Sequence, residues 1–253
     1  MNILLVNDDG IAAPGIAALY EAVRDLGNVD VIAPEGERSA VSHSITLDKP
    51  ISVRKYIRDG LFEGIAVGGS PADCVKLALN ELLDRRPDLV LSGINLGCNS
   101  GLNVIYSGTV GAAAEAVFNG IPGVAVSLTT YQDPNWEPAK IFIRKLVQRI
   151  AERSIPEGVL LNVNVPNVTD GAEIAGVRIT EQGMAQWQEA FQKRTDPKGR
   201  TYYWMSGSKK EMPGNETIDD TAIKNNYISV TPVQFNLTAY AEMKEIHALE
   251  LEY

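Results

Sequence analysis

Short apolar segments alternate with helical patterns along the first two thirds of this chain, and this alternation limits the possible folds more than any other feature. The apolar segments have the length of strands and lie at residues 2–7, 29–33, 89–92, 124–128 and 159–163. Segments with apolar residues at helical spacing lie at residues 14–26, 72–83, 110–118 and 139–151. Strands that are apolar on both sides and joined by helices form a parallel sheet covered on both faces. We therefore predict an α/β fold of that kind.

The alternation stops after Pro166. Residues 170–212 are polar, aromatic and irregular, and we predict extended, hairpin-like segments there. Residues 227–233 (YISVTPV) predict a strand, and residues 238–249 predict a terminal amphipathic helix. No repeat and no linker divides the chain. We therefore predict a single domain, with a core at residues 1–166 and a C-terminal appendage at residues 167–253.

Charge and cysteine content narrow the classes of partner. The chain of 253 residues carries 23 basic and 32 acidic side chains, a net charge of -9, which weighs against binding a nucleic acid polymer. Cys74 and Cys98 lie far apart without metal-ligand spacing, which is typical of a reducing compartment. We find no signal peptide and no apolar run of membrane-spanning length. We therefore expect a soluble cytoplasmic protein that has no membrane partner.

Two adjacent carboxylates, Asp8 and Asp9, end the first predicted strand, and ligands of open α/β sheets bind beyond such strand ends. Paired carboxylates are costly there because like charges repel and burial adds desolvation. A divalent cation removes that cost, and oxygen ligands suit Mg²⁺ or Mn²⁺. Both side chains can face one ion only if the backbone turns, and Gly10 permits a turn. The alternative is a plain turn in which Asp9 caps the next helix.

A glycine-rich segment, residues 92–101 (SGINLGCNSG), follows a later predicted strand. Asn95 offers a carbonyl oxygen to a metal, and Asn99 offers donors to a phosphate. The segment lacks the Gly-Lys-Ser/Thr ending of a phosphate-binding P-loop and the glycine spacing of a dinucleotide fingerprint. A turn-rich connection without a ligand is the alternative.

Two more segments carry hydroxyl groups where they could bind a phosphate or a metal. Ser107, Gly108 and Thr109 open a predicted helix, where hydroxyls and N–H groups form an anion site, although simple helix capping predicts the same residues. Ser39 lies in the loop after the second predicted strand and offers a neutral oxygen. His43 lies in the same loop, within reach of a substrate.

Taken in order, these segments resemble the SurE survival protein family of metal-dependent 5′-nucleotidases. The matching stretches are residues 3–10 (ILLVNDDG), Arg38-Ser39, 70–75 (SPADCV), 92–101 (SGINLGCNSG), 106–115 (YSGTVGAAAE), 161–166 (LNVNVP) and 227–232 (YISVTP). The likeness covers most of the chain and weakens between Pro166 and Asp219.

The resemblance implies a Rossmann-like fold with a C-terminal hairpin and helix appendage that is used in oligomerisation. Its C-terminal arm is exchanged in a homodimer, with a tetramer left open. It implies one divalent cation per subunit, Mg²⁺ or Mn²⁺, with the ligands Asp8, Asp9, Ser39 and Asn95. The implied activity is hydrolysis of nucleoside 5′-monophosphates to nucleoside and phosphate. Further activity on 3′-nucleotides or short polyphosphate stays open.

Four positions depart from the family pattern. Ala40 and Asn226 stand where the pattern has glycine, His43 stands in place of asparagine, and Asn236 in place of aspartate. None is an implied metal ligand. Ala40 and His43 lie in the predicted substrate loop, so substrate preference, rather than activity, is the property that they affect.

The predicted reaction is metal-assisted hydrolysis of a phosphomonoester. Asp8 and Asp9 are the predicted catalytic residues, and either one could accept a proton from the attacking water. The predicted phosphate and substrate ligands are Gly10, Asn99, Ser107, Gly108, Thr109 and His43. A non-catalytic nucleotide-binding module is the main alternative, and the paired carboxylates argue against it. A dinucleotide-dependent oxidoreductase is disfavoured because the first strand is not followed by the glycine fingerprint.

Overall fold

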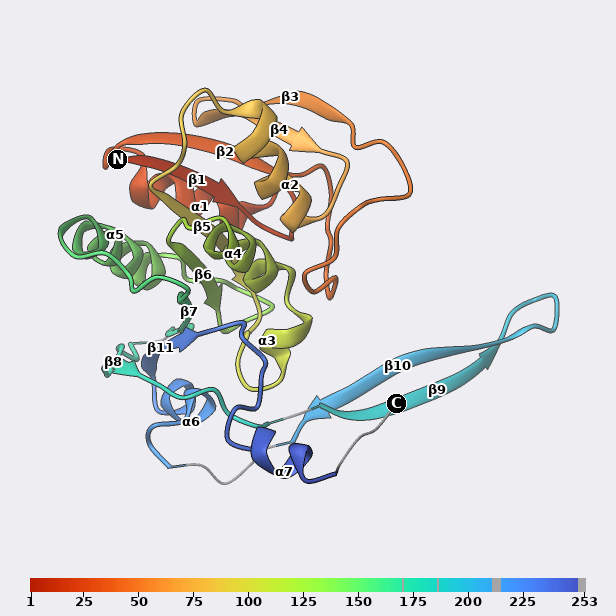
Figure 1. Ribbon diagram of the computed structural model, residues 1–253. Coiled ribbons are helices and arrows are strands. Elements are labelled where there is room, and N and C mark those ends of the chain that lie inside the picture. The colour runs from red at the N-terminus through yellow and green to blue at the C-terminus, as the bar shows by residue number, and fades with distance from the viewer. Residues whose placement is uncertain (170, 186, 211–214, 250–253) are drawn as a thin grey trace.

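The computed structural model describes residues 1–169, 171–185, 187–210 and 215–249, and its centre is a nine-stranded sheet (Figure 1). The strands are β1 (Asn2–Val6), β2 (Asn28–Pro34), β3 (Val53–Arg58), β4 (Phe62–Val67), β5 (Leu89–Leu96), β6 (Gly123–Leu128), β7 (Leu160–Val165), β8 (Gly176–Ile179) and β11 (Tyr227–Val233). Their order across the sheet is β3-β4-β2-β1-β5-β6-β7-β11-β8. Only the β3–β4 and β7–β11 pairs are antiparallel, which confirms the predicted mostly parallel α/β sheet.

Helices cover both faces of this sheet, as predicted. The helices are α1 (Pro14–Val23), α2 (Pro71–Leu77), α3 (Asn103–Tyr106), α4 (Gly108–Phe118), α5 (Glu137–Glu152) and α6 (Asp219–Lys224), and a π-helical turn, η1 (Ala78–Leu82), extends α2. On β1, Ile3 and Leu5 face a core layer shared with α1 and α5. Leu4 and Val6 face the opposite layer, which α2 and α4 supply. A strand with apolar layers on both faces must be apolar at nearly every position, which is why the sequence of β1 is an almost continuous run of apolar residues.

The end of α1 differs from its prediction. The helix ends at Val23, three residues before the expected end at residue 26. Gly27 does not act there as a left-handed cap. A Cβ atom on Gly27 would lie 2.0 Å from the carbonyl oxygen of Met1, so the residue permits a close approach between this turn and the start of β1.

Strands β3 and β4 were not predicted. The charged sequence of β3 lacks the apolar pattern of the central strands, and Glu63 and Gly64 interrupt the apolar residues of β4. β3 lies at an edge of the sheet and carries Arg54, Lys55 and Arg58. Charged side chains on an edge strand prevent pairing with other chains, and they also remove the alternation by which a strand is recognised.

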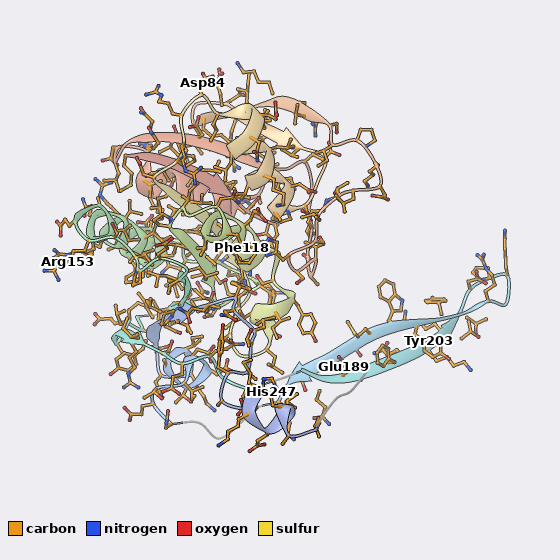
Figure 2. The ribbon with its side chains drawn as sticks, viewed as in Figure 1. Asp84, Phe118, Arg153, Glu189, Tyr203 and His247 are labelled. Carbon is orange, nitrogen blue, oxygen red and sulfur yellow. The ribbon has the colours of Figure 1, made fainter. Side chains whose placement is uncertain are left out.

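The C-terminal third adds two strands to the sheet and one hairpin beside it. β9 (Trp187–Thr195) and β10 (Thr201–Lys209) pair only with each other and form the predicted hairpin, which projects away from the sheet (Figure 1). Glu189 and Tyr203 mark it in Figure 2. Residues 170, 186, 211 and 212 of the predicted hairpin-like stretch lie outside the described residues.

The terminal helix is shorter than predicted. α7 spans Met243–His247, whereas the amphipathic pattern predicts a helix over residues 238–249. The apolar side chains of this segment are exposed, at 88% for Leu237 and 56% for Ile246. A helix this short depends on packing rather than on its own propensity. Among the described residues, no helix is both long and apolar enough to cross a membrane.

Candidate active site

The carboxyl ends of β1 and β5 bring the predicted site residues to one edge of the sheet. Val6 of β1 pairs with Ser92 of β5, so Asp8 and the glycine-rich segment leave the sheet side by side. The loop after β2 joins them, because the Arg38 N–H donates to the carbonyl oxygen of Asp8 at 2.7 Å. The start of α4 completes the group through a bond from the Thr109 hydroxyl to Asp8 Oδ1 at 2.6 Å.

A tight turn directs the two aspartates. Asn7 Nδ2 donates to the Gly10 carbonyl at 2.9 Å, and the Gly10 N–H donates back to Asn7 Oδ1 at 3.2 Å. Gly10 has φ +100°, as the predicted turn requires, and a Cβ atom on it would lie 3.1 Å from the Cα of Gly36 in the loop after β2. Asn7 was not among the predicted site residues. The sequence signal was a single amide at the end of a predicted apolar strand, and the structure buries it fully.

Both aspartates are electrostatically unfavourable when no cation is nearby. Burial raises the pKa of Asp8, even though the Thr109 hydroxyl bond lowers it. The pKa of Asp9 rises to about 7, first because of burial and then because of the charges of Asp8 and Glu37. The Leu96 N–H donates to the Asp9 carboxylate and offsets part of this rise. Negative charge is thus concentrated here beyond what the surrounding donors compensate.

Glu37 is a third carboxylate at this site, which sequence reasoning missed. The Ser39 hydroxyl donates to Glu37 Oε1 at 2.5 Å, and the charge of Glu37 raises the pKa of both aspartates. The only signal in the sequence was its position two residues before Ser39. Because the Ser39 proton goes to Glu37, the lone pairs of the Ser39 oxygen are left for a cation.

Asn95 is oriented by its own backbone neighbour. Its Nδ2 donates to the Gly97 carbonyl at 2.7 Å, which leaves Oδ1 as the atom that can face a cation. β5 runs four residues beyond its predicted end at residue 92 and contains a register shift between Ser92 and Asn95. A Cβ atom on Gly93 would lie 2.4 Å from the Val126 carbonyl, so only glycine fits this irregular stretch.

Asn99 lies in a buried amide network on the adjoining strands. Its side chain donates to Ser127 Oγ at 3.0 Å, and its N–H donates to Asn164 Oδ1 at 2.8 Å. Its carbonyl accepts from Asn162 Nδ2 at 2.7 Å. These bonds hold the glycine-rich segment on β6 and β7. A phosphate contact by the Asn99 side chain stays a prediction.

The start of α4 lies directly against Asp8. The Ser107 hydroxyl accepts from the Val110 N–H at 3.1 Å and so caps the helix, which leaves its proton to donate. A Cβ atom on Gly108 would lie 2.9 Å from Asp8 Cβ and 3.0 Å from Asp8 Oδ2. Only glycine therefore lets the helix begin this close to the carboxylate. His43 points elsewhere along α4, where its Nε2 bonds to Glu115 Oε2 at 2.8 Å.

The donor set of this site suits a hard divalent cation. The described residues contain no group of three or more His, Cys, Asp and Glu side chains that could hold a metal. A cation at this edge would instead take carboxylate oxygens from Asp8 and Asp9 and neutral oxygens from Ser39 and Asn95. Oxygen-only donors suit Mg²⁺ and Mn²⁺ rather than metals that prefer thiolate or imidazole.

Comparison with known proteins agrees with this arrangement. The family model described as Survival protein SurE matches residues 3–189. The 5′-nucleotidase SurE of Trichormus variabilis is 48% identical over 252 residues, with 94% of each chain covered. The 5′-nucleotidase SurE of Caldanaerobacter subterraneus is 42% identical, covering 99% of this chain and 98% of the relative.

A solved structure extends the agreement to three dimensions. The crystal structure of the SurE protein from Aquifex aeolicus matches with a TM-score of 0.85 and 41% identity, and the match covers 99% of this chain and 100% of that one. The resemblance that the sequence motifs predict is thereby confirmed, and this chain belongs to the SurE family.

Proposed function

We propose that this chain is a metal-dependent 5′-nucleotidase that hydrolyses nucleoside 5′-monophosphates to nucleoside and phosphate. One observation carries the proposal: two adjacent carboxylates, Asp8 and Asp9, stand with raised pKa values against the N-terminal end of α4. Curated SurE relatives at 42–48% identity carry the name 5′-nucleotidase, which supports the same activity.

Asp8, Asp9, Ser39 and Asn95 would hold the proposed metal, one Mg²⁺ or Mn²⁺ per subunit. When bound, such a cation neutralises phosphate charge and lowers the pKa of a coordinated water. Hydrogen bonds within the chain orient these ligands. The Thr109 hydroxyl donates to one oxygen of the Asp8 carboxylate, and Glu37 accepts the proton of the Ser39 hydroxyl.

The start of α4 supplies the proposed phosphate site. The Ser107 hydroxyl and the N–H of Gly108 are available to the non-bridging oxygens, and the positive end of the helix dipole favours their charge. Because α4 begins against Asp8, a phosphate held there lies next to the carboxylates. Positioning of this kind is the main contribution that a protein makes to phosphoryl transfer. Substrate contacts by Gly10, Asn99, Thr109 and His43 remain predictions, and the last three side chains already bond within the protein.

We also propose a homodimer in which the C-terminal arm, residues 236–249 of the described chain, crosses to the partner, while Phe235 packs on Phe118 of its own subunit. Leu237, Tyr240 and Ile246 of the arm are exposed within one subunit. A second copy would bury them in a closed, two-fold exchange. A tetramer is the larger assembly that this arrangement leaves open.

A metal requirement is the first expected outcome. Protein stripped with EDTA should release no phosphate from nucleoside 5′-monophosphates, and Mg²⁺ or Mn²⁺ should restore the activity. Asp9→Asn should lower kcat/KM by on the order of a thousandfold, because a lost ligand removes several kcal/mol of charge stabilisation. A phosphate-release screen over nucleotides and metals measures this. Full activity in excess EDTA would overturn the proposal, and binding of nucleotide without any release would favour a sensing module.

Asp9→Asn, which should lower activity, should raise the stability of the metal-free protein. The pKa of Asp9 is raised from 3.8 to about 7 in the folded protein. Its contribution to stability is therefore present below 3.8 and is lost as pH rises through about 7. Without metal, at about pH 8, Asp9→Asn should be more stable than the wild type by roughly 1–2 kcal/mol, after allowance for partial solvent screening. The gain should shrink at about pH 5. Thermal unfolding at both pH values measures it, and a pH-independent difference would contradict the electrostatic cause.

Thr109 should be needed for turnover and not merely for the start of the helix. Thr109→Val removes the hydroxyl that donates to the buried Asp8 carboxylate, and a bond to a charged group contributes roughly 1.5–3 kcal/mol. We expect kcat/KM to fall at least tenfold, and Thr109→Ser to keep most of the activity. Steady-state kinetics with a melting curve for each variant decide the matter. A loss of stability with normal kinetics would assign Thr109 to the helix alone.

Removal of the arm should break the dimer. A chain that ends at Val233 should run as a monomer or aggregate, while the full-length chain should run as a dimer at micromolar concentration in sizing with light scattering. Ile141 on α5 offers a control outside the C-terminal appendage, because its side chain is also exposed. Changing it to serine should leave the dimer intact. A monomeric full-length chain would show that the terminal segment packs within its own subunit.

A further inference from the structure

The loop between β2 and β3 is attached to three helices beyond the site. Ser42 Oγ donates to the Ile105 carbonyl of α3 at 2.7 Å. His43 bonds to Glu115 of α4, and the Thr46 hydroxyl donates to Asp73 Oδ2 of α2 at 2.7 Å. The same loop carries Ser39 and Glu37 a few residues earlier. Ser39 therefore lies close in sequence to all three attachments.

Glu115 is a buried carboxylate that binds the loop at His43. Its side chain is 5% exposed and lies about two turns along α4 from Gly108. Lys76 Nζ and Asn119 Nδ2 both bond to its Oε1, at 2.8 and 2.9 Å. His43 Nε2 bonds to its Oε2 at 2.8 Å. A carboxylate can only accept, so His43 Nε2 carries a proton. A buried carboxylate loses much of its hydration, so each of these donors matters for its placement.

Packing fixes the loop on α4 as closely as the hydrogen bond does. The His43 ring stacks on Phe118 with centroids 5.1 Å apart and planes 8° from parallel. Figure 2 marks Phe118 on α4. A Cβ atom on Gly111 would lie 2.6 Å from the Ser42 carbonyl oxygen and 3.1 Å from His43 Cα. The backbone of the loop thus rests directly on the helix.

The two oxygens of Glu115 serve different segments. Oε1 ties α4 to α2 through Lys76, which is a contact between helices of the core. Oε2 ties α4 to the loop through His43. A purely structural role for Glu115 would depend on Lys76 as much as on His43. A role in placing the loop would depend on His43.

We propose that Glu115 and His43 are positioning residues that hold the loop of residues 37–46 on α4 and so keep Ser39 in line with Asp8 and Asp9. The inference rests on the proposed metal site. α4 begins at Asp8 and binds His43 near its other end, so one rigid helix sets the distance between the carboxylates and the loop. Release of His43 lowers the fraction of molecules in which Ser39 is in place. The apparent metal affinity then falls in proportion to the fraction of molecules that keep Ser39 in place.

The test compares variants by Mn²⁺ binding to EDTA-stripped protein in calorimetry and by hydrogen exchange of residues 37–46. His43→Ala and Glu115→Gln should weaken Mn²⁺ binding by roughly tenfold and speed exchange in the loop. His43→Gln keeps a donor of similar reach and should restore part of the affinity. Lys76→Met should lower the melting temperature and leave Mn²⁺ affinity unchanged. Glu152→Gln, which breaks an exposed pair with Arg149 on α5, is the matched control and should change neither.

Unchanged Mn²⁺ affinity and loop exchange in a folded His43→Ala protein would overturn the inference. An equal loss in Lys76→Met would overturn it as well, because the effect would then follow from helix packing. A wild-type protein that binds no Mn²⁺ would instead overturn the proposed metal site. Loop exchange, which needs no metal, then shows by itself whether His43 and Glu115 hold the loop.

Discussion

Burial of two neighbouring carboxylates is the constraint around which this site is built. Asp8 and Asp9 follow a buried strand, and burial raises the pKa of both. The charge of Glu37 adds to each rise, and the charge of Asp8 adds to the rise at Asp9. The backbone turn at Gly10 brings a second loop within contact, and Gly108 allows a helix to begin against Asp8. Each approach needs the absence of a side chain. The glycines therefore set how closely donors and a cation can surround the charge.

The sequence predicts the parts of the fold whose physical cause is local. β1, β2, β5, β6 and β7 lie between two apolar layers, so their composition reveals them. β3 pairs on one side only and carries charge, so nothing in its composition marks it as a strand. For the terminal segment, the sequence predicts more structure than is observed. Its periodicity indicates a helix of twelve residues, about three turns, but its apolar side chains remain exposed and only Met243–His247 is helical.

The same distinction holds for the site. Asp8, Asp9, Asn95 and Ser107 stand at strand or helix ends, where general rules place ligands, so the sequence identifies them as candidates. Glu37 and Glu115 could not, because an isolated glutamate in a polar or helical stretch resembles any solvated side chain. Their importance follows from tertiary contacts, with Ser39 in one case and with His43 and Lys76 in the other. Two departures from the family pattern also gain a physical meaning. Ala40 and Asn226 have φ +53° and +58°, a region that glycine adopts without strain.

Helix α4 connects the packing of the core with the geometry of the site. Its apolar face places Ala112 and Ala116 in the core layer beneath β1, which fixes its axis. Its first residue, Gly108, then lies at Asp8, and Glu115 lies at His43. Because small residues form most of this helix, it packs closely enough for the backbone of the loop at Ser42 to rest on Gly111. Larger side chains on α4 would move the helix away from the sheet and separate the loop from the carboxylates. The small residues of α4 therefore serve the geometry of the site as well as the packing of the core.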